Sequence, residues 1–141
     1  MNKFWGHLKT ITHHRHLVMC GCFRMGLIWQ GLTHDLSKYS PTEFLAGVRY
    51  YQGDRSPNTA EREANGYSLA WMHHKGRNRH HFEYWTDLSP KTRTYEPVDM
   101  PVRYLCEMVA DRIAACKTYQ GAAYTDASPL QYLDRANESR L

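Results

Sequence analysis

The segment GLTHDLSKYSP, residues 31–41, sets a histidine beside an aspartate and places a lysine three residues later. Imidazole nitrogens and carboxylate oxygens are common ligands of divalent transition metals. His34 and Asp35 are therefore candidate metal ligands. Lys38 lies about one helical turn onward, where its ammonium could meet an anionic group presented to that metal.

Histidines elsewhere in the chain supply further candidate ligands. Nine are present, and most fall in short stretches, among them HHRH at residues 13–16 and the pairs His73-His74 and His80-His81. Adjacent residues on a helix point about 100° apart, so we expect one ligand and one neighbour from each pair. The alternative for both pairs is a basic surface loop flanked by aromatic residues.

Two acids lie on one face of a late apolar segment. A carboxylate on an apolar helix face is costly unless it is paired or bound to a metal, so we interpret Asp111 as a ligand. Glu107 lies one turn earlier, and we interpret it as the residue that orients a ligand histidine through its second ring nitrogen. Buried ion pairs with Arg103 or Arg112 are the alternative.

The order of these residues, H…HD…H…H…D, resembles the HD-domain superfamily of metal-dependent phosphohydrolases. The segments HDLSKYSPTEF, AWMHHKGRNRHHFEYW and MPVRYLCEMVAD are similar to a small uncharacterised bacterial and phage family within or near that superfamily. The likeness covers most of the chain, from about residue 14 to residue 111. HD hydrolases usually have a longer interval between the first histidine and the HD pair than this sequence has.

The resemblance implies a single HD-like helical domain with six metal ligands. It favours His14 over His13 and His16, and His74 over His73. Between His80 and His81 it does not decide, and we take His81. The implied ligands are His14, His34, Asp35, His74, His81 and Asp111.

This ligand set would hold one or two divalent ions, drawn from Fe, Mn, Zn, Co and Ni, with Asp35 bridging a pair. Two ions about 3.5–4 Å apart can activate a water and stabilise charge on a phosphoryl group. The resemblance therefore implies a phosphohydrolase acting on a small phosphorylated substrate, with a nucleotide favoured. Lys38 and Arg77 are candidates for holding phosphate oxygens, and ordinary surface cations are the alternative for both.

Two other functions use the same residues differently. A di-iron site of this kind activates O2 in some HD relatives, which would make the protein an oxygenase. Alternatively, the chain is a binding module for nucleic acid or a protein partner, with a structural metal and with cations and rings at residues 75–85. Nucleic acid is not favoured, because the pI of about 8.9 lies below the value typical of dedicated nucleic-acid domains.

The composition fits one globular domain over residues 1–141. Hydrophobic residues make up 42% and charged residues 23% of the chain, and no run is long and apolar enough to span a membrane. The N-terminus is too polar for a signal peptide, so we expect a cytoplasmic protein. The spacing of the four cysteines matches no disulfide framework or zinc motif, which favours reduced core residues.

Helical periodicity predicts an all-α bundle of about five to seven helices that position the candidate ligands. Three Ser-Pro pairs predict helix starts near residues 41, 57 and 129, with Glu43 placed for a capping box. We expect His14 on a helix over 10–27 and the HD pair at the end of a helix over 28–36. The first histidine pair should lie at the end of a helix over 67–75, followed by an ordered loop over 87–101 and by Asp111 on a helix over 101–119.

Overall fold

The computed structural model describes residues 2–138, with side chains described through residue 135. Within this range the chain forms seven α-helices, three short 3-10 helices and one small hairpin, which confirms an all-α fold. The α-helices are α1 (Lys3–Arg24), α2 (Ile28–Thr33), α3 (Pro41–Arg49), α4 (Pro57–Asn65), α5 (Leu69–Lys75), α6 (Val102–Gln120) and α7 (Ser128–Glu138). The 3-10 helices are η1 (Leu36–Tyr39), η2 (Phe82–Tyr84) and η3 (Gly121–Ala123), and the strands are β1 (Thr86–Leu88) and β2 (Tyr95–Pro97).

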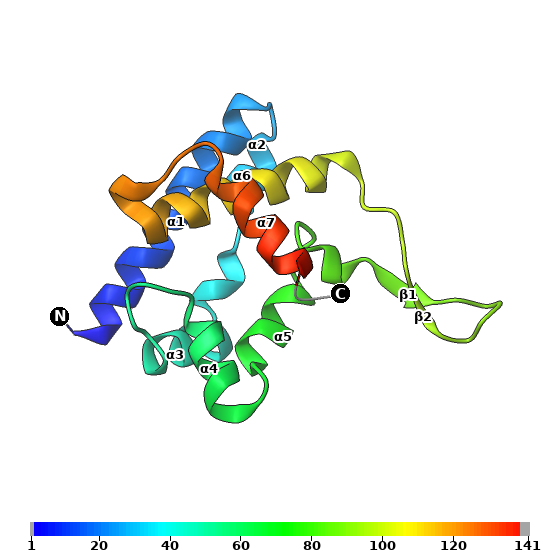
Figure 1. Cartoon of the computed structure of the whole chain (residues 1–141), viewed down its shortest axis with the longest axis horizontal. Coiled ribbons are helices and arrows are strands. Elements are labelled where there is room, and N and C mark those ends of the chain that lie inside the picture. Colours follow the sequence, from blue (N-terminus) through cyan, green and yellow to red (C-terminus); the bar gives the residue numbers. More distant parts are fainter. Residues whose placement is uncertain (1, 139–141) are drawn as a thin grey trace.

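The two long helices α1 and α6 cross near the centre of the molecule, with α2 packed against α1 (Figure 1). Helices α3, α4 and α5 form a second group, in which α3 contacts both of the others and α1. The apolar core lies at the crossing and contains Val18, Cys22, Ala110 and Ala114. The space between the two groups of helices is filled by polar side chains, and this is where the candidate site lies.

Helix α1 begins seven residues earlier than the apolar periodicity predicts. The side chain of Asn2 accepts a hydrogen bond from the backbone nitrogen of Phe4 at 2.9 Å, and this cap starts the helix at Lys3. In the added turns the buried residues are Gly6 and His7, while Phe4 and Trp5 are exposed, so the apolar periodicity did not reveal them. They place His7 on the same buried face as Ile11 and His14.

The Ser-Pro helix starts are confirmed for α3, α4 and α7. The capping box expected at α3 is wrong, because the side chain of Ser40 makes no capping hydrogen bond. Glu43 turns away from the end of its helix and contacts His73 and His74 instead. A residue that looked like a local helix signal therefore belongs to the site.

The loop expected over residues 87–101 contains an antiparallel hairpin, in which Leu88 pairs with Tyr95. The hairpin extends away from the helices (Figure 1). Its strands have three residues each, too few to show an alternating pattern in the sequence.

All four cysteines are free, as expected for reduced residues. None of the helices within residues 2–138 is long and apolar enough to cross a membrane.

Candidate metal centre

The HD pair lies at a break between two helical segments, not inside the helix expected over residues 28–36. Helix α2 ends at Thr33, and Asp35 has a left-handed backbone with φ of 54° before η1 begins. Aspartate tolerates this conformation better than most residues, and such backbones are common at functional sites. Arg15 fixes the break by donating to the carbonyl of His34 at 2.7 Å. The break turns both side chains inward, and His34 and Asp35 are only 2% and 1% exposed.

The first group of candidate ligands comes from α1, the HD break and α6, and contains His14, His34, Asp35 and Asp111. Asp111 Oδ1 lies 2.9 Å from His14 Nε2 and 3.2 Å from His34 Nε2. Asp35 Oδ2 lies 3.3 Å from His34 Nε2 and 3.7 Å from His14 Nε2. Donor atoms bound about 2.1 Å from one ion, at angles near 90–110°, are about 3.0–3.4 Å apart. The spacing of this group therefore suits a single ion.

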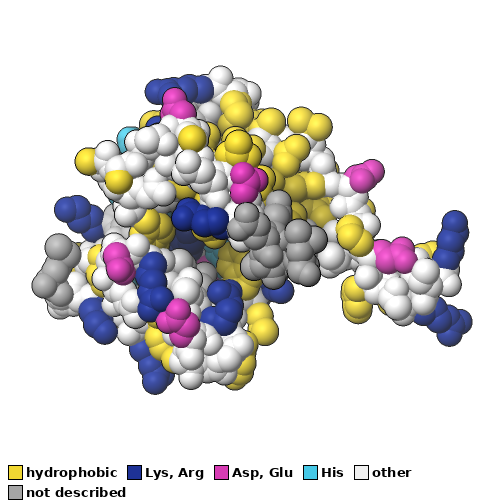
Figure 2. Space-filling view, viewed as in Figure 1, with side chains coloured by type: hydrophobic (Ala, Val, Ile, Leu, Met, Phe, Trp, Pro, Cys, Tyr) yellow, Lys and Arg dark blue, Asp and Glu magenta, His cyan; other side chains and the backbone are white. Residues whose placement is uncertain are grey.

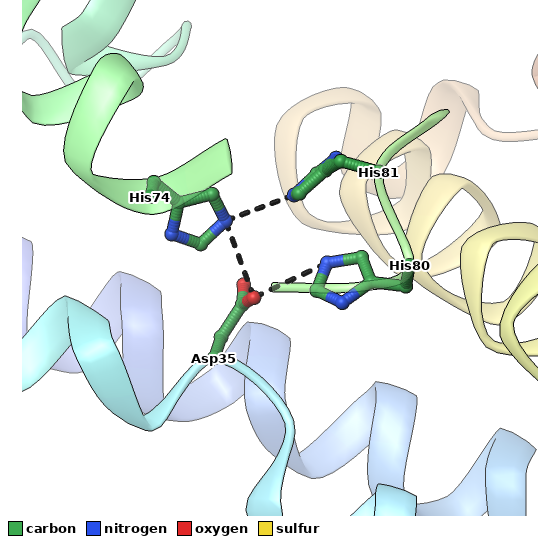
Figure 3. A group of neighbouring side chains, drawn as sticks. All are labelled: Asp35, His74, His80 and His81. Atoms are coloured by element: carbon green, nitrogen blue, oxygen red, sulfur yellow. Dashed lines mark hydrogen bonds and ion pairs between the residues drawn. The ribbon is translucent and has the colours of Figure 1, made fainter. Parts of the chain in front are cut away.

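The second group contains Asp35, His74, His80 and His81 (Figure 3). Asp35 Oδ1 is 3.3 Å from His74 Nε2 and 3.3 Å from His80 Nε2. His81 joins this group, with its Nε2 2.9 Å from that of His74. The two carboxylate oxygens of Asp35 thus face different sets of imidazoles, the arrangement that a bridging ligand requires.

Both members of the second histidine pair reach the cluster, although we expected only one. Residues 80 and 81 lie in an irregular turn before η2, so the 100° separation of helical neighbours does not apply to them. His80, the alternative to His81 in that pair, is 2% exposed and lies against Asp35. In the first pair, which is helical, the separation does apply. His74 faces Asp35, while the Nδ1 of His73 contacts Glu43 Oε2 at 2.7 Å.

Two outer carboxylates hold the ligand imidazoles by their second nitrogens. Glu107 Oε1 lies 2.8 Å from Nδ1 of His34 and 3.2 Å from Nδ1 of His80. Its other oxygen accepts a hydrogen bond from Gln30 Nε2 at 2.7 Å. Glu43 Oε1 lies 2.6 Å from Nδ1 of His74. Carboxylate–histidine pairs of this kind fix ring orientation and tautomer at metal sites.

The buried atoms at the centre of the cluster have few protein partners. Within the described residues, neither oxygen of Asp35 nor Nε2 of His80 has a hydrogen bond of good geometry. The Lys38 ammonium lies 2.6 Å from Asp35 Oδ2 and balances its charge. Buried polar groups normally have a bonding partner. A metal ion bound by the oxygens of Asp35 and by His80 Nε2 would provide that partner. A donor set of imidazoles and carboxylates suits Fe, Mn, Zn, Co or Ni.

The charges in the cluster favour ionised carboxylates and protonated rings of His34, His74 and His80. Burial instead lowers the pKa of His14 and His81, which favours their neutral form. Burial opposes ionisation of Asp35, but His34, Lys38 and His74 outweigh it and hold its pKa well below the usual value. Burial likewise opposes the protonated form of His80, but Asp35 and Glu107 raise its pKa to about 9. A bound cation would therefore replace protons.

A cavity of about 600 Å³ opens beside the cluster and is lined by His14, His74, His81 and Asp111. Figure 2 shows the face of the molecule hollowed near its centre, with Lys and Arg side chains around the hollow. The cavity lining includes Lys38, Arg62 and Arg112. Lys38 pairs with Asp35, whereas no carboxylate among residues 2–135 forms an ion pair with Arg62 or Arg112. Such cations can bind an anionic group next to the candidate metal centre.

Arg77 is not brought to this cavity. Its side chain is exposed and donates to the carbonyl of His73 at 3.1 Å, at the end of α5. Arg62 and Arg112, which line the cavity, are the candidates for the phosphate-binding role that we had expected of Arg77. The sequence gives no local signal for either, because each reaches the cavity only through the packing of its helix against others.

Comparisons with known proteins give a family but no activity. No curated protein and no solved structure matches this chain significantly. The model of a family of unknown function, DUF5662, matches residues 3–140 and so includes every residue of the candidate metal centre. The chain belongs to the DUF5662 family.

Proposed function

We propose that this protein is a metal-dependent phosphohydrolase acting on a small phosphorylated substrate, with a nucleotide favoured. The observation that carries the proposal is Asp35, whose two oxygens face separate groups of candidate ligands. Ligands of both groups line a cavity whose wall also contains Arg62 and Arg112. The order of the ligands, which resembles that of HD-domain phosphohydrolases, supports the same chemistry. One or two divalent ions would supply an activated water and stabilise charge on the phosphoryl oxygens.

Some residues of the site would hold the metal ions and orient their ligands, and others would bind the phosphate. Asp35 bridges the two groups of ligands, and Glu107 and Glu43 keep the imidazoles in their orientations. A cation beside Asp35 would repel the ammonium of Lys38, which already lies at the cavity wall. Lys38 would then turn to a phosphate oxygen, and the forked guanidinium of Arg112 would contact the others.

The test is a screen for phosphate release from nucleotides and phosphorylated metabolites with Mn, Co, Ni, Zn or Fe. We expect release by the wild type and none by Asp35→Ala, which removes the shared ligand. Asp87→Ala changes an exposed carboxylate of the hairpin and should behave like the wild type. The proposal fails if the wild type releases no phosphate with any metal, or if Asp35→Ala releases as much. Iron-dependent O2 uptake without phosphate release would support the oxygenase alternative.

A further inference from the structure

The cavity extends along α1 beyond the candidate metal centre. His7, Ile11 and His14 line it from one face of the helix, at intervals of four and three residues. The rise of a helix separates His7 from His14 by about 10 Å along the axis. Residues from α6 and from the segment after α3 complete this part of the cavity, and we define the neutral arm as His7, Tyr51, Thr118, Tyr119 and Gln120.

His7 is held firmly in the neutral arm. Its side chain is buried, with 5% exposure, and lies between the rings of Phe44 and Tyr51 at centroid distances of 5.3 and 6.2 Å. The imidazole rests on Gly47, where a Cβ atom would lie 2.1 Å from Nε2. A larger residue at position 47 would displace the ring. The ring is therefore fixed by its surroundings and has little freedom to turn elsewhere.

The neutral arm offers hydrogen bonds without charge. Burial, followed by the nearby Lys38, lowers the pKa of His7 to about 4, so the imidazole is neutral at pH 7 with one donor and one acceptor. The other members contribute hydroxyl groups and one amide. Burial raises the pKa of Tyr119, so its phenol stays protonated. Lys38 lines the same cavity and contacts Asp35 Oδ2 at 2.6 Å, which links the neutral arm to the candidate metal centre.

Buried polar atoms that lack a hydrogen bond of good geometry are concentrated in two places, the candidate metal centre and the neutral arm. In the described part of the chain there are seven such side-chain atoms, of which three belong to Asp35 and His80. Three others are His7 Nδ1, Thr118 Oγ1 and Gln120 Oε1, all from the neutral arm. A buried donor or acceptor without a partner is costly, so these atoms indicate a ligand.

We infer that the neutral arm binds a sugar ring that carries the phosphate, and that His7 is a specificity-determining residue for it. Sugar hydroxyls donate and accept, which matches a neutral imidazole, a threonine hydroxyl, a glutamine amide and two phenols. The phosphate would lie at Lys38, and the sugar would extend along α1 toward His7. The inference rests on the proposed function for the position of the phosphate.

The test compares two phosphate esters, ribose 5-phosphate and p-nitrophenyl phosphate, which has a good leaving group and no sugar hydroxyls. His7→Phe keeps a ring against Gly47 and removes both nitrogens. We expect this variant to raise the KM for ribose 5-phosphate roughly tenfold, the size of one lost hydrogen bond, with p-nitrophenyl phosphate hydrolysis nearly unchanged. His13→Phe is the matched control, since His13 is exposed on the same helix.

Equal losses for both esters in His7→Phe, or no loss for either, would overturn the inference. Thr118→Val removes one hydroxyl at nearly constant volume and gives the same test if His7→Phe does not fold. Calorimetric titration with ribose 5-phosphate separates the inference from the proposed function. One outcome is that the wild type binds this ester, His7→Phe does not, and neither protein releases phosphate. This result would overturn the proposed hydrolase function and support the sugar site. If the wild type neither binds nor hydrolyses it, the sugar site is overturned.

Discussion

At the scale of single residues, Asp35 determines what the cluster can hold. Its side chain is fully buried, and each oxygen faces a different set of imidazoles. No other residue belongs to both groups. His14 and Asp111 belong only to the first, whereas His74 and His81 belong only to the second. The structure therefore predicts that the ligands are not equivalent.

Metal stoichiometry tests this prediction. We expect Asp35→Ala to lose both ions, because it removes a ligand from each group. His74→Ala and His14→Ala should each lose about one ion of two, since each change affects a single group. Elemental analysis of purified protein measures the ratio, and Asp87→Ala serves as the control. Full stoichiometry in Asp35→Ala, or loss of both ions in His74→Ala, would contradict a bridging role.

Some members of the candidate metal centre were predictable from the sequence, because the evidence for them is local. An aspartate next to a histidine, and an acid on an apolar helix face, stand out without knowledge of the fold. The expectation that only one of His80 and His81 reaches the cluster was wrong, because the pair lies in a turn and not on a helix. Arg62 and Arg112 were missed because only the assembled fold brings them to the cavity.

At the scale of secondary structure elements, the helix starts at Ser-Pro pairs were predictable and the helix ends were less so. Proline at the first helical position acts through its own backbone, so the signal survives in any fold. The break at Asp35 depends on contacts far away in the sequence, such as the bond from Arg15 to the carbonyl of His34. The role of Glu43 was likewise not predictable from local sequence, because its partners on α5 are 30 and 31 residues away.

Helix α6 supplies both a ligand, Asp111, and the acid one turn earlier that orients ligands from other elements. Glu107 contacts His34 from the HD break and His80 from the turn before η2. Glu107→Gln keeps the shape but removes the charge, so both imidazoles lose their anionic partner. We expect metal affinity to fall about 10- to 100-fold, as for other outer carboxylates, without a change in stoichiometry at saturation.

Competition with a chromogenic chelator measures this change in affinity. Glu96→Gln, on the hairpin, is the control and should match the wild type. An affinity for Glu107→Gln equal to that of the wild type would show that the imidazoles hold their orientation without this carboxylate. Complete loss of metal would instead place Glu107 among the ligands, together with His34 and His80 in a third possible site.

At the scale of the whole molecule, the two groups of helices meet over polar side chains. The apolar core cluster lies at the crossing of α1 and α6, with a few smaller buried residues such as Ala60 and Ala70 elsewhere. His34, His80 and Asp35 are among the most deeply buried side chains. Such an interior is costly unless its charges are balanced. In the absence of a metal, protons on His34, His74 and His80 and the ammonium of Lys38 provide that balance. Metal binding and protonation are therefore alternatives in the same interior.

This competition predicts how metal affinity depends on pH. The pKa of His80 is raised to about 9, because Asp35 and Glu107 outweigh the effect of burial, so the ring is protonated at pH 7 and must release its proton to bind an ion. The apparent affinity should rise as the pH increases from about 6.5 to about 9 and level off above the highest histidine pKa. Glu107, with its pKa lowered to about 2, stays ionised throughout and adds no slope.

Calorimetric titration with Zn2+ or Mn2+, in buffers of different ionisation enthalpy, measures both the affinity and the protons released. We expect release of at least one proton per protein at pH 7 and fewer near pH 9. His80→Gln should release fewer protons than the wild type at pH 7, while His13→Gln, which changes an exposed ring, should release the same number. An affinity that does not vary with pH would show that the histidines are already neutral, and that Lys38 alone balances the buried carboxylates in the metal-free protein.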